Sequence, residues 1–304
     1  MSSTRIALAG ATGNLGIPLL KALLDADFFV TVLSRKGGNA AKLPSHPNLD
    51  VKKVDLQSVE SLRPALSGVE VVVSCVASAA IGSQNPLIDA SVAAGVKRFV
   101  PAEFGMDSRN RLCAQLPVVC APKVATQKYL VQQSEARPGF TFTAIANGLF
   151  LDWGLEMGVI LDLGRRSATL YNGGDVPFSA TTLSDVVAAV LGVIRHQPQT
   201  ANRVVYVHSA LVTQNQLIQY AKEFDRKEWS TSVKDTEELR RESLVELAKG
   251  ALADVDGAML GLCICGAMSS DYGCDFSERL DNELLGIEKM DETRLRAVVA
   301  SFLG

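Results

Sequence analysis

The sequence predicts an α/β protein with a Rossmann-type, doubly wound parallel sheet and a smaller, mainly helical second lobe. Strand-like and helix-like segments alternate through its first half, which is typical of this fold class. Several of the strand-like segments are apolar almost throughout, as expected when helices cover both faces of a sheet. A glycine-rich turn joins the first strand to the first helix. The 304 residues, 47% of them hydrophobic, suffice for one large domain or two closely joined ones.

The first strand and its turn lie in "RIALAGATGNLGIPLL", where residues 5–9 predict a strand and residues 14–26 a helix. In a dinucleotide-binding fold, Gly10 makes the turn, Gly13 lets the pyrophosphate approach, and Gly16 lets the helix pack close to the sheet. The helix N-terminus presents free N–H groups to the phosphates. The spacing is G-x-x-G-x-x-G, which is common in short-chain dehydrogenase-like folds. With a strand before it and a helix after it, the motif predicts nucleotide binding instead of a plain turn.

The second strand, expected over residues 28–34, indicates which nucleotide is bound. An NAD enzyme usually places a carboxylate at the end of this strand to hold the ribose 2′-hydroxyl. Here Ser34, Arg35 and Lys36 occupy that place. Two cations suit a 2′-phosphate, and arginine can bind it through two parallel hydrogen bonds. The sequence therefore predicts NADP(H) as cofactor.

The remaining elements follow in order along the chain. Strands are expected over 50–56, 69–77, 96–104 and 140–147, and helices over 58–68 and 85–95. After residue 147 the alternation loosens, although the helix expected over 181–195 and the strand over 203–208 could return to the sheet. From residue 213 the chain is mostly helical and charged. We therefore expect an NADP-binding Rossmann domain over residues 1–150, with 180–208 returning to it, and a smaller substrate-binding lobe over 151–304.

Composition narrows the classes of partner. A net charge of −3 with 21% charged residues favours neither nucleic acid nor an anionic membrane as partner. No basic-then-apolar leader opens the sequence, and no apolar run approaches the roughly 18 residues of a spanning helix. The six cysteines have no framework spacing, and no histidine lies near Cys263 and Cys265 to complete a metal site. We expect reduced thiols, no metal, a cytoplasmic location, and a monomer or homodimer.

Several longer motifs resemble the NmrA-like and isoflavone reductase-like family of atypical short-chain dehydrogenases, a group that includes phenylcoumaran benzylic ether reductases and pinoresinol reductases. The resemblance covers most of the chain and is strongest over residues 4–190. It rests on the arginine after the second strand and on these segments: "GATGNLG", "VVVSCVASAAIGSQ", "GVKRFVPAEFGMD", "APKVATQKYL", "FTAIANGLFLDWG" and "YNGGDVPFSATTLSDVVAAVL".

The resemblance implies a set of cofactor-binding positions. The segment from Cys75 to Ser78 lines the nicotinamide ribose, Phe104 lies beside the cofactor, and the segment around Asn147 closes over the carboxamide end. The complete expected set is Gly10, Thr12, Gly13, Asn14, Leu15, Gly16, Arg35, Lys36, Cys75, Val76, Ala77, Ser78, Phe104, Lys123 and Asn147.

Catalysis differs from that of ordinary short-chain dehydrogenases, which use a Tyr-x-x-x-Lys pair. None of the five tyrosines here is followed by a lysine four residues later. The resemblance implies instead a single catalytic lysine at the start of the helix after "EFG", and Lys123 matches that place best. Near a helix N-terminus and a nicotinamide cation its charged form is disfavoured, which makes it a usable acid or base. Lys128 is the rival, about 140° further around the helix, so the two cannot face one pocket.

These observations predict an NADPH-dependent reductase of an aromatic or polyketide-type secondary metabolite, acting on a carbonyl, an enone or a quinone-methide-like carbon. Lys123 would serve as acid/base. Phe104, Phe150 and Trp153 would hold a flat small-molecule substrate, unless they are plain core residues. Two alternatives remain open: an NmrA-like regulator that binds NADP without turnover and senses redox state, and a non-redox biosynthetic catalyst on the same fold.

Overall fold

The computed structural model describes residues 4–303, which divide into two compact units. Among these residues, the first unit holds those up to Glu103 together with Pro122–Ile145 and Val187–Val205. The second unit holds Phe104–Ala121, Ala146–Val186 and the residues from Tyr206 onward. Each unit is therefore assembled from separate stretches of the chain.

The first unit is built on a seven-stranded sheet with the strand order β10-β6-β5-β4-β1-β2-β3. The strand pairings from β3 across to β6 are all parallel. Strand order reverses between β1 and β4, which makes their carboxyl ends the topological switch point where such folds bind ligands. The doubly wound fold class predicted from the sequence is confirmed. The strands span Arg5–Ala9 (β1), Phe29–Arg35 (β2), Leu49–Val54 (β3), Val71–Ser74 (β4), Arg98–Val100 (β5), Thr141–Ala146 (β6) and Arg203–Tyr206 (β10).

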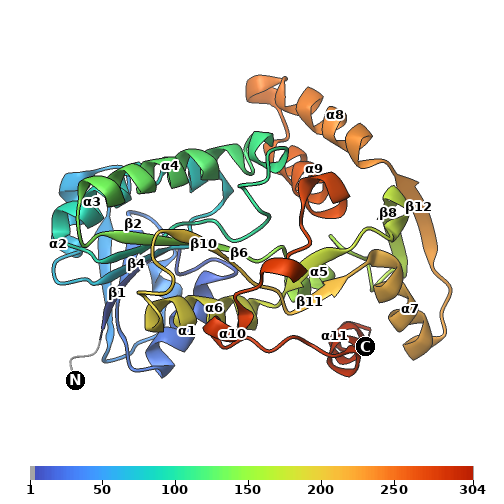
Figure 1. The fold of residues 1–304 in the computed structure, drawn as a ribbon, viewed down its shortest axis with the longest axis horizontal. Helices are drawn as coiled ribbons and strands as arrows, with labels where there is room; N and C mark the ends of the chain where they lie inside the picture. Colours follow the sequence, from blue (N-terminus) through green and yellow to red (C-terminus); the bar gives the residue numbers. More distant parts are fainter. Residues whose placement is uncertain (1–3, 304) are drawn as a thin grey trace. The chain divides into compact units, whose positions relative to one another are not determined.

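Helices cover both faces of this sheet. In Figure 1, α2, α3 and α4 lie on one side of the strands and α1 and α6 on the other. The first group packs on one hydrophobic core, which includes Leu62, Ile88 and Leu130 from the helices and Phe99 and Phe142 from the sheet. The helices span Gly16–Asp25 (α1), Val59–Ala65 (α2), Asn85–Ala94 (α3), Ala121–Ala136 (α4) and Leu183–Arg195 (α6).

Local sequence explains why these elements form. Four of the five residues of β1 are fully buried, which accounts for its apolar sequence. In α1, Leu19 and Leu23 are one turn apart and both 0% exposed, so the helix presents one leucine face to the sheet. Ser58 caps α2 by accepting a hydrogen bond from the Ser61 N–H at 3.2 Å.

A buried arginine stands at the start of β5. Arg98 is 1% exposed, and its Nε donates to the Thr141 hydroxyl at 2.8 Å. Its Nη1 donates to the hydroxyls of Thr143 and Thr200, and its Nη2 donates to the Gln197 carbonyl. Burial lowers the pKa of Arg98 to about 10, so the side chain remains a cation at neutral pH. Hydroxyl and carbonyl acceptors from two segments, β6 and residues 197–200, replace the water that this cation has lost.

The second unit is richer in strands than the sequence indicated. It contains a three-stranded sheet, β11-β9-β7, and a two-stranded sheet, β12-β8, alongside its helices. Its strands span Leu149–Phe150 (β7), Ser167–Tyr171 (β8), Phe178–Thr181 (β9), Ala210–Val212 (β11) and Ser230–Lys234 (β12). Its helices span Leu151–Glu156 (α5), Gln214–Asp225 (α7), Thr236–Leu247 (α8), Val255–Met268 (α9), Asn282–Leu285 (α10) and Glu292–Ser301 (α11). Short 3-10 helices in the two units span Ala40–Lys42, Ser78–Ser83, Cys113–Gln115, Asn172–Gly174, Gly250–Leu252, Ser270–Tyr272 and Ser277–Arg279.

Within residues 4–303, no helix combines the length and the apolar character needed to cross a membrane.

Candidate cofactor site and catalytic lysine

A cavity of about 590 Å³ lies at the switch point of the first unit. It is formed where β1, β2 and β4 end, so the strand–helix turn after β1 and the chain after β4 share its walls. Seven of the predicted cofactor-binding residues line it: Gly10, Thr12, Gly13, Arg35, Cys75, Val76 and Ala77.

The glycine loop has two crowded positions and one open position. Gly10 has a φ of +82°, and a Cβ there would lie 2.2 Å from the Cys75 carbonyl oxygen. A Cβ on Gly16 would lie 2.1 Å from the Gly10 carbonyl oxygen, so this glycine allows the loop backbone to pass the helix start. A Cβ on Gly13 would meet only the Gly10 carbonyl oxygen, at 3.4 Å. The loop backbone therefore packs closely against the start of α1 and against the chain after β4. The Gly13 backbone has no such close neighbour and lines the cavity.

The start of α1 supplies the donors that a phosphate requires. No side chain caps the helix at Leu15, and the Gly13 N–H is already bonded to the Gly10 carbonyl at 3.1 Å. The Ile17 N–H donates to the Gly13 carbonyl at 3.0 Å, the Leu19 N–H donates to the Leu15 carbonyl at 3.1 Å, and Pro18 has no N–H. The donors left for a phosphate at this helix start are therefore the backbone amides of residues 14–16. Leu15 itself is 8% exposed and packs in the core, so it can offer only its backbone, while Thr12 and Asn14 are exposed.

The charge at the end of β2 is positive. Arg35 is the last residue of the strand, is exposed, and lines the cavity. Lys36 follows it and is also exposed, but it is outside the lining. No aspartate or glutamate is among the described residues that line this cavity. An arginine without a neighbouring carboxylate fits a 2′-phosphate better than a ribose 2′-hydroxyl.

The chain after β4 forms the opposite wall. The Cys75 N–H donates to the Ala9 carbonyl at 2.8 Å, which fixes this segment to the end of β1. Burial raises the pKa of the Cys75 thiol to about 12, so the side chain is a neutral thiol at physiological pH and no nucleophile. Val76 and Ala77 continue the wall. The side chain of Ser78, the fourth predicted residue of this segment, lies outside what the structure describes.

Lys123 and Lys128 have opposite environments on α4. Lys123, in the first turn, is 5% exposed, whereas Lys128 is exposed. Within residues 4–303, the Lys123 ammonium forms no hydrogen bond or ion pair with a protein group. Burial of the side chain therefore distinguishes the two candidates.

The other predicted site residues belong to the second unit. Phe104 is half-buried with a φ of +21°, a strained value for a bulky residue. Asn147 is 0% exposed, and its Nδ2 donates to the Gly148 carbonyl at 3.2 Å. Its side-chain carbonyl oxygen has no hydrogen-bond partner among the described residues. Phe150, at the end of β7, and Trp153, in α5, are both half-buried.

Sequence reasoning missed several residues of the cofactor cavity. Gly37 and Gly38 line it directly after the two cations, and Leu56 lines it just past the end of β3. Leu56 could have been found, because the carboxyl ends of parallel strands meet at one edge of the sheet. Leu43 has no comparable signal, since it lies in the irregular connection between β2 and β3. The remaining lining residues are Ala11, Val32, Leu33, Ser34, Asn39 and Ala80.

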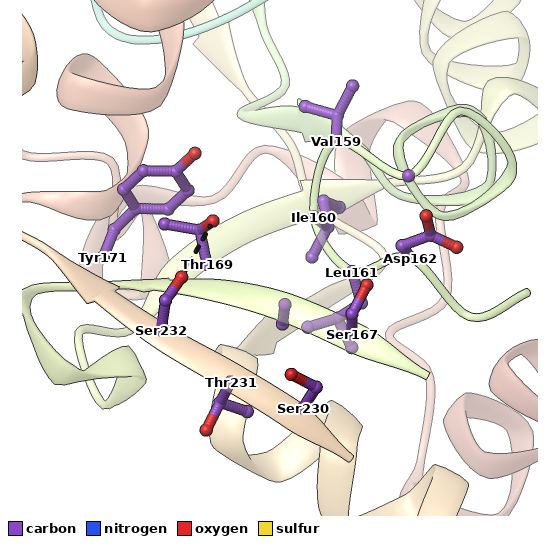
Figure 2. A pocket seen from close by; sticks show the side chains of 12 residues that line it. Val159, Ile160, Leu161, Asp162, Ser167, Thr169, Tyr171, Ser230, Thr231 and Ser232 are labelled. Carbon is purple, nitrogen blue, oxygen red and sulfur yellow. Dashed lines mark hydrogen bonds between the residues drawn. The ribbon is translucent and has the colours of Figure 1, made fainter. Parts of the chain in front are cut away.

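The second unit has a cavity of its own, of about 310 Å³, between the loop 158–162 and strands β8 and β12. Figure 2 shows the hydroxyls of Thr169, Tyr171 and Ser232 gathered on one side of it. Ser232 donates to Thr169 at 3.4 Å. The predicted substrate residues of this unit are not among those that line it. Across the described chain, no group of three or more His, Cys, Asp or Glu side chains could hold a metal ion.

Comparison with known proteins agrees with this geometry. The model of the NmrA-like family matches residues 2–241. Oxidoreductase aprR of Aspergillus flavus is 32% identical over 307 residues, covering 98% of each chain. Isoflavone reductase homolog IRL of Zea mays is 29% identical over 215 residues, covering 67% of this chain and 68% of that protein. The solved structure of AtPrR2 with NADP⁺ and (+)pinoresinol has a TM-score of 0.69 and 20% identity, covering 96% of this chain and 92% of that one.

The resemblance predicted from the sequence motifs is thereby confirmed. A match over residues 2–241 spans well over half of the chain, and it includes the glycine loop, Arg35 and Lys123. The protein belongs to the NmrA-like family.

Proposed function

We propose that the protein is an NADPH-dependent oxidoreductase that reduces an aromatic or polyketide-type small molecule at a carbonyl, an enone or a quinone-methide-like carbon, with Lys123 as the acid/base. Family membership and the relatives named oxidoreductase and isoflavone reductase homolog support the reaction class. The proposal places the enzyme in the cytoplasm as a monomer or homodimer.

The residues of the switch-point cavity fit the cofactor. The bare backbone at Gly13 and the amides of residues 14–16 would hold the pyrophosphate, and Arg35, with Lys36 beside it, would hold the 2′-phosphate. Cys75, Val76, Ala77 and Ser78 would line the nicotinamide ribose. When bound, NADPH supplies the hydride that a reduction requires.

The burial of Lys123 is the observation that carries the catalytic proposal. Lys123 is 5% exposed as a residue, and its ammonium, which has no protein partner among the described residues, is available to a substrate oxygen. In that position Lys123 would donate a hydrogen bond to the oxygen on which negative charge develops, and would then pass it a proton or relay one. Lys128 is exposed and cannot replace it.

The substrate side of the proposal rests on the second unit. Phe104, Phe150 and Trp153 are aromatic and half-buried, as side chains that stack on a flat substrate would be. Asn147, with its unpartnered carbonyl oxygen, would receive the carboxamide end of the cofactor. AtPrR2 has been solved with (+)pinoresinol, a precedent for an aromatic ligand on this fold. We assign cofactor binding to residues 1–150 with 180–208 and substrate binding to the rest of 151–304, with Phe104 contributing to both.

The proposal is tested by following NADPH absorbance while a panel of aromatic ketones, enones and quinones is added to the purified protein. We expect at least one acceptor to be reduced, with the hydride taken from NADPH in preference to NADH. Tight NADP(H) binding without consumption across the panel would favour the redox-sensing alternative. A product of unchanged oxidation state would instead favour non-redox chemistry.

A further inference from the structure

A second cavity of the first unit, which we name the α1 pocket, lies beside the cofactor cavity. It has a volume of about 410 Å³, within the range of about 300–1,000 Å³ typical of small-molecule sites. Its walls are apolar: Ile17, Leu20 and Leu24 from α1, and Leu43 and Pro44 from the connection between β2 and β3.

The wall of the α1 pocket includes a large hydrophobic side chain, Ile17, that is exposed to solvent and does not pack in the core. Leu20 and Leu24 are 2% and 5% exposed and form the floor of the pocket, as part of the buried face of α1. Ile17 is 61% exposed at the edge of the same hollow. Covering this concave apolar surface with an apolar ligand would remove the isoleucine from water. Such burial favours binding by about 25 cal/mol per Å² of apolar area removed from water.

The rim of the pocket is cationic. Lys21 is paired with Asp25 at 2.5 Å, so these two charges compensate each other. Lys42 is exposed and has no ion-pair partner among residues 4–303. His46 Nδ1 accepts the Asn48 N–H at 3.1 Å, and because a backbone N–H can only donate, the ring proton lies on Nε2. The rim thus offers an ammonium and a ring N–H to a ligand.

We propose that the α1 pocket binds an amphipathic carboxylic acid, with its alkyl or aryl body against Ile17 and Leu43 and its carboxylate at Lys42 and His46. A neutral apolar ligand would leave both rim donors without an acceptor, and a cationic one would be repelled by Lys42. Ala11, Thr12 and Leu43 line both the α1 pocket and the cofactor cavity. The two sites are therefore separate in volume but share a wall.

The test is calorimetric titration of the NADP⁺-saturated protein with decanoate, using decylamine as the charge-reversed probe. Saturation with NADP⁺ keeps decanoate out of the cofactor cavity. We expect saturable binding of decanoate, and no binding of decylamine. Lys42→Glu should weaken decanoate about tenfold or more, as for a lost charge-assisted hydrogen bond. Ile17→Ser should weaken it about fivefold or more through the lost apolar contact.

Two matched variants of the same unit serve as controls. Lys53→Glu reverses another exposed lysine, and Val131→Ser removes another exposed β-branched residue. Neither residue lines the α1 pocket. Both should bind decanoate as the parent does. The proposal is overturned if decanoate does not saturate, if NADP⁺ abolishes its binding, or if Lys42→Glu and Ile17→Ser bind it as well as the controls. No turnover is measured, so this result is independent of the proposed reductase activity.

Discussion

Replacing Lys123 by methionine removes the ammonium and keeps an unbranched side chain of similar length in the same buried place. Lys123 is 5% exposed, so the methionine stem can follow the packed path of the lysine. General acid/base groups contribute about 10²- to 10⁴-fold, and we expect kcat/KM for an identified acceptor to fall in that range. NADPH binding should change only a few-fold, because the glycine loop and Arg35 are untouched.

Stability provides a second readout for the same variant. The ammonium has no protein partner within the described chain, so its loss breaks no hydrogen bond or ion pair. We expect the unfolding free energy in urea titrations to stay within about 1 kcal/mol of the parent value. A loss of activity with intact stability separates a chemical role from a structural one.

Lys128→Met is the matched control, because it removes an exposed lysine from the same helix. It should leave kcat/KM and NADPH affinity near the parent values. The reasoning fails if Lys123→Met loses less than about tenfold in kcat/KM, or if Lys128→Met does the greater damage. The site would then share only the family's fold and cofactor.

Three further predictions concern the cofactor loop, the charge beside it and the core. Arg35→Ala should weaken NADPH by about 1.5 kcal/mol, or roughly tenfold, and leave NADH unchanged in fluorescence titrations; equal losses would contradict a 2′-phosphate contact. Gly13→Val should abolish NADPH binding yet keep the melting temperature, whereas Gly10→Val should lower both, because its Cβ would lie 2.2 Å from a carbonyl oxygen. Burial lowers the pKa of His208 from 6.5 to about 4, so the unfolded state binds the extra proton and stability falls by about 3 kcal/mol as pH drops from 6.5 to 4. A His208→Gln variant should show a flatter pH dependence of urea unfolding over that range, and an unchanged slope would refute the assignment.

The sheet of the first unit could be predicted closely because its signals are local. The strand expected over residues 5–9 is β1 without a shift, and the helix expected over 85–95 is α3 to within one residue. The strand expected over 28–34 is β2 shifted by one residue. The remaining predicted strands of this sheet were too long by one to six residues, as with β5, which was expected over 96–104 and spans only Arg98–Val100. Apolar sequence continues past the last ladder bond of such a strand, so hydrophobicity alone does not mark where pairing stops.

The strands of the second unit were missed for a physical reason. The exposed strand β12 reads "STSVK", and β8 reads "SATLY", so neither shows the alternation that a half-buried strand requires. They pair with each other across some sixty residues of sequence, and their pairing is set by tertiary contacts. Likewise, burial separates Lys123 from Lys128, and the sequence could show only that the two point in different directions.

Arg98 has a consequence for how the chain can be divided. The partners of its guanidinium include Thr200 and Gln197, and β6 is also bonded to this segment through Asn202 and Phe142. A fragment that ends near residue 150 would contain the whole glycine loop. It would lack the acceptors at Gln197 and Thr200, so the buried guanidinium of Arg98 would lose part of its hydrogen bonds. Such a piece should be insoluble or molten, and restoring residues 187–205 by circular permutation or a short fusion should rescue it. The smallest autonomous cofactor-binding module of this protein is thus discontinuous in sequence.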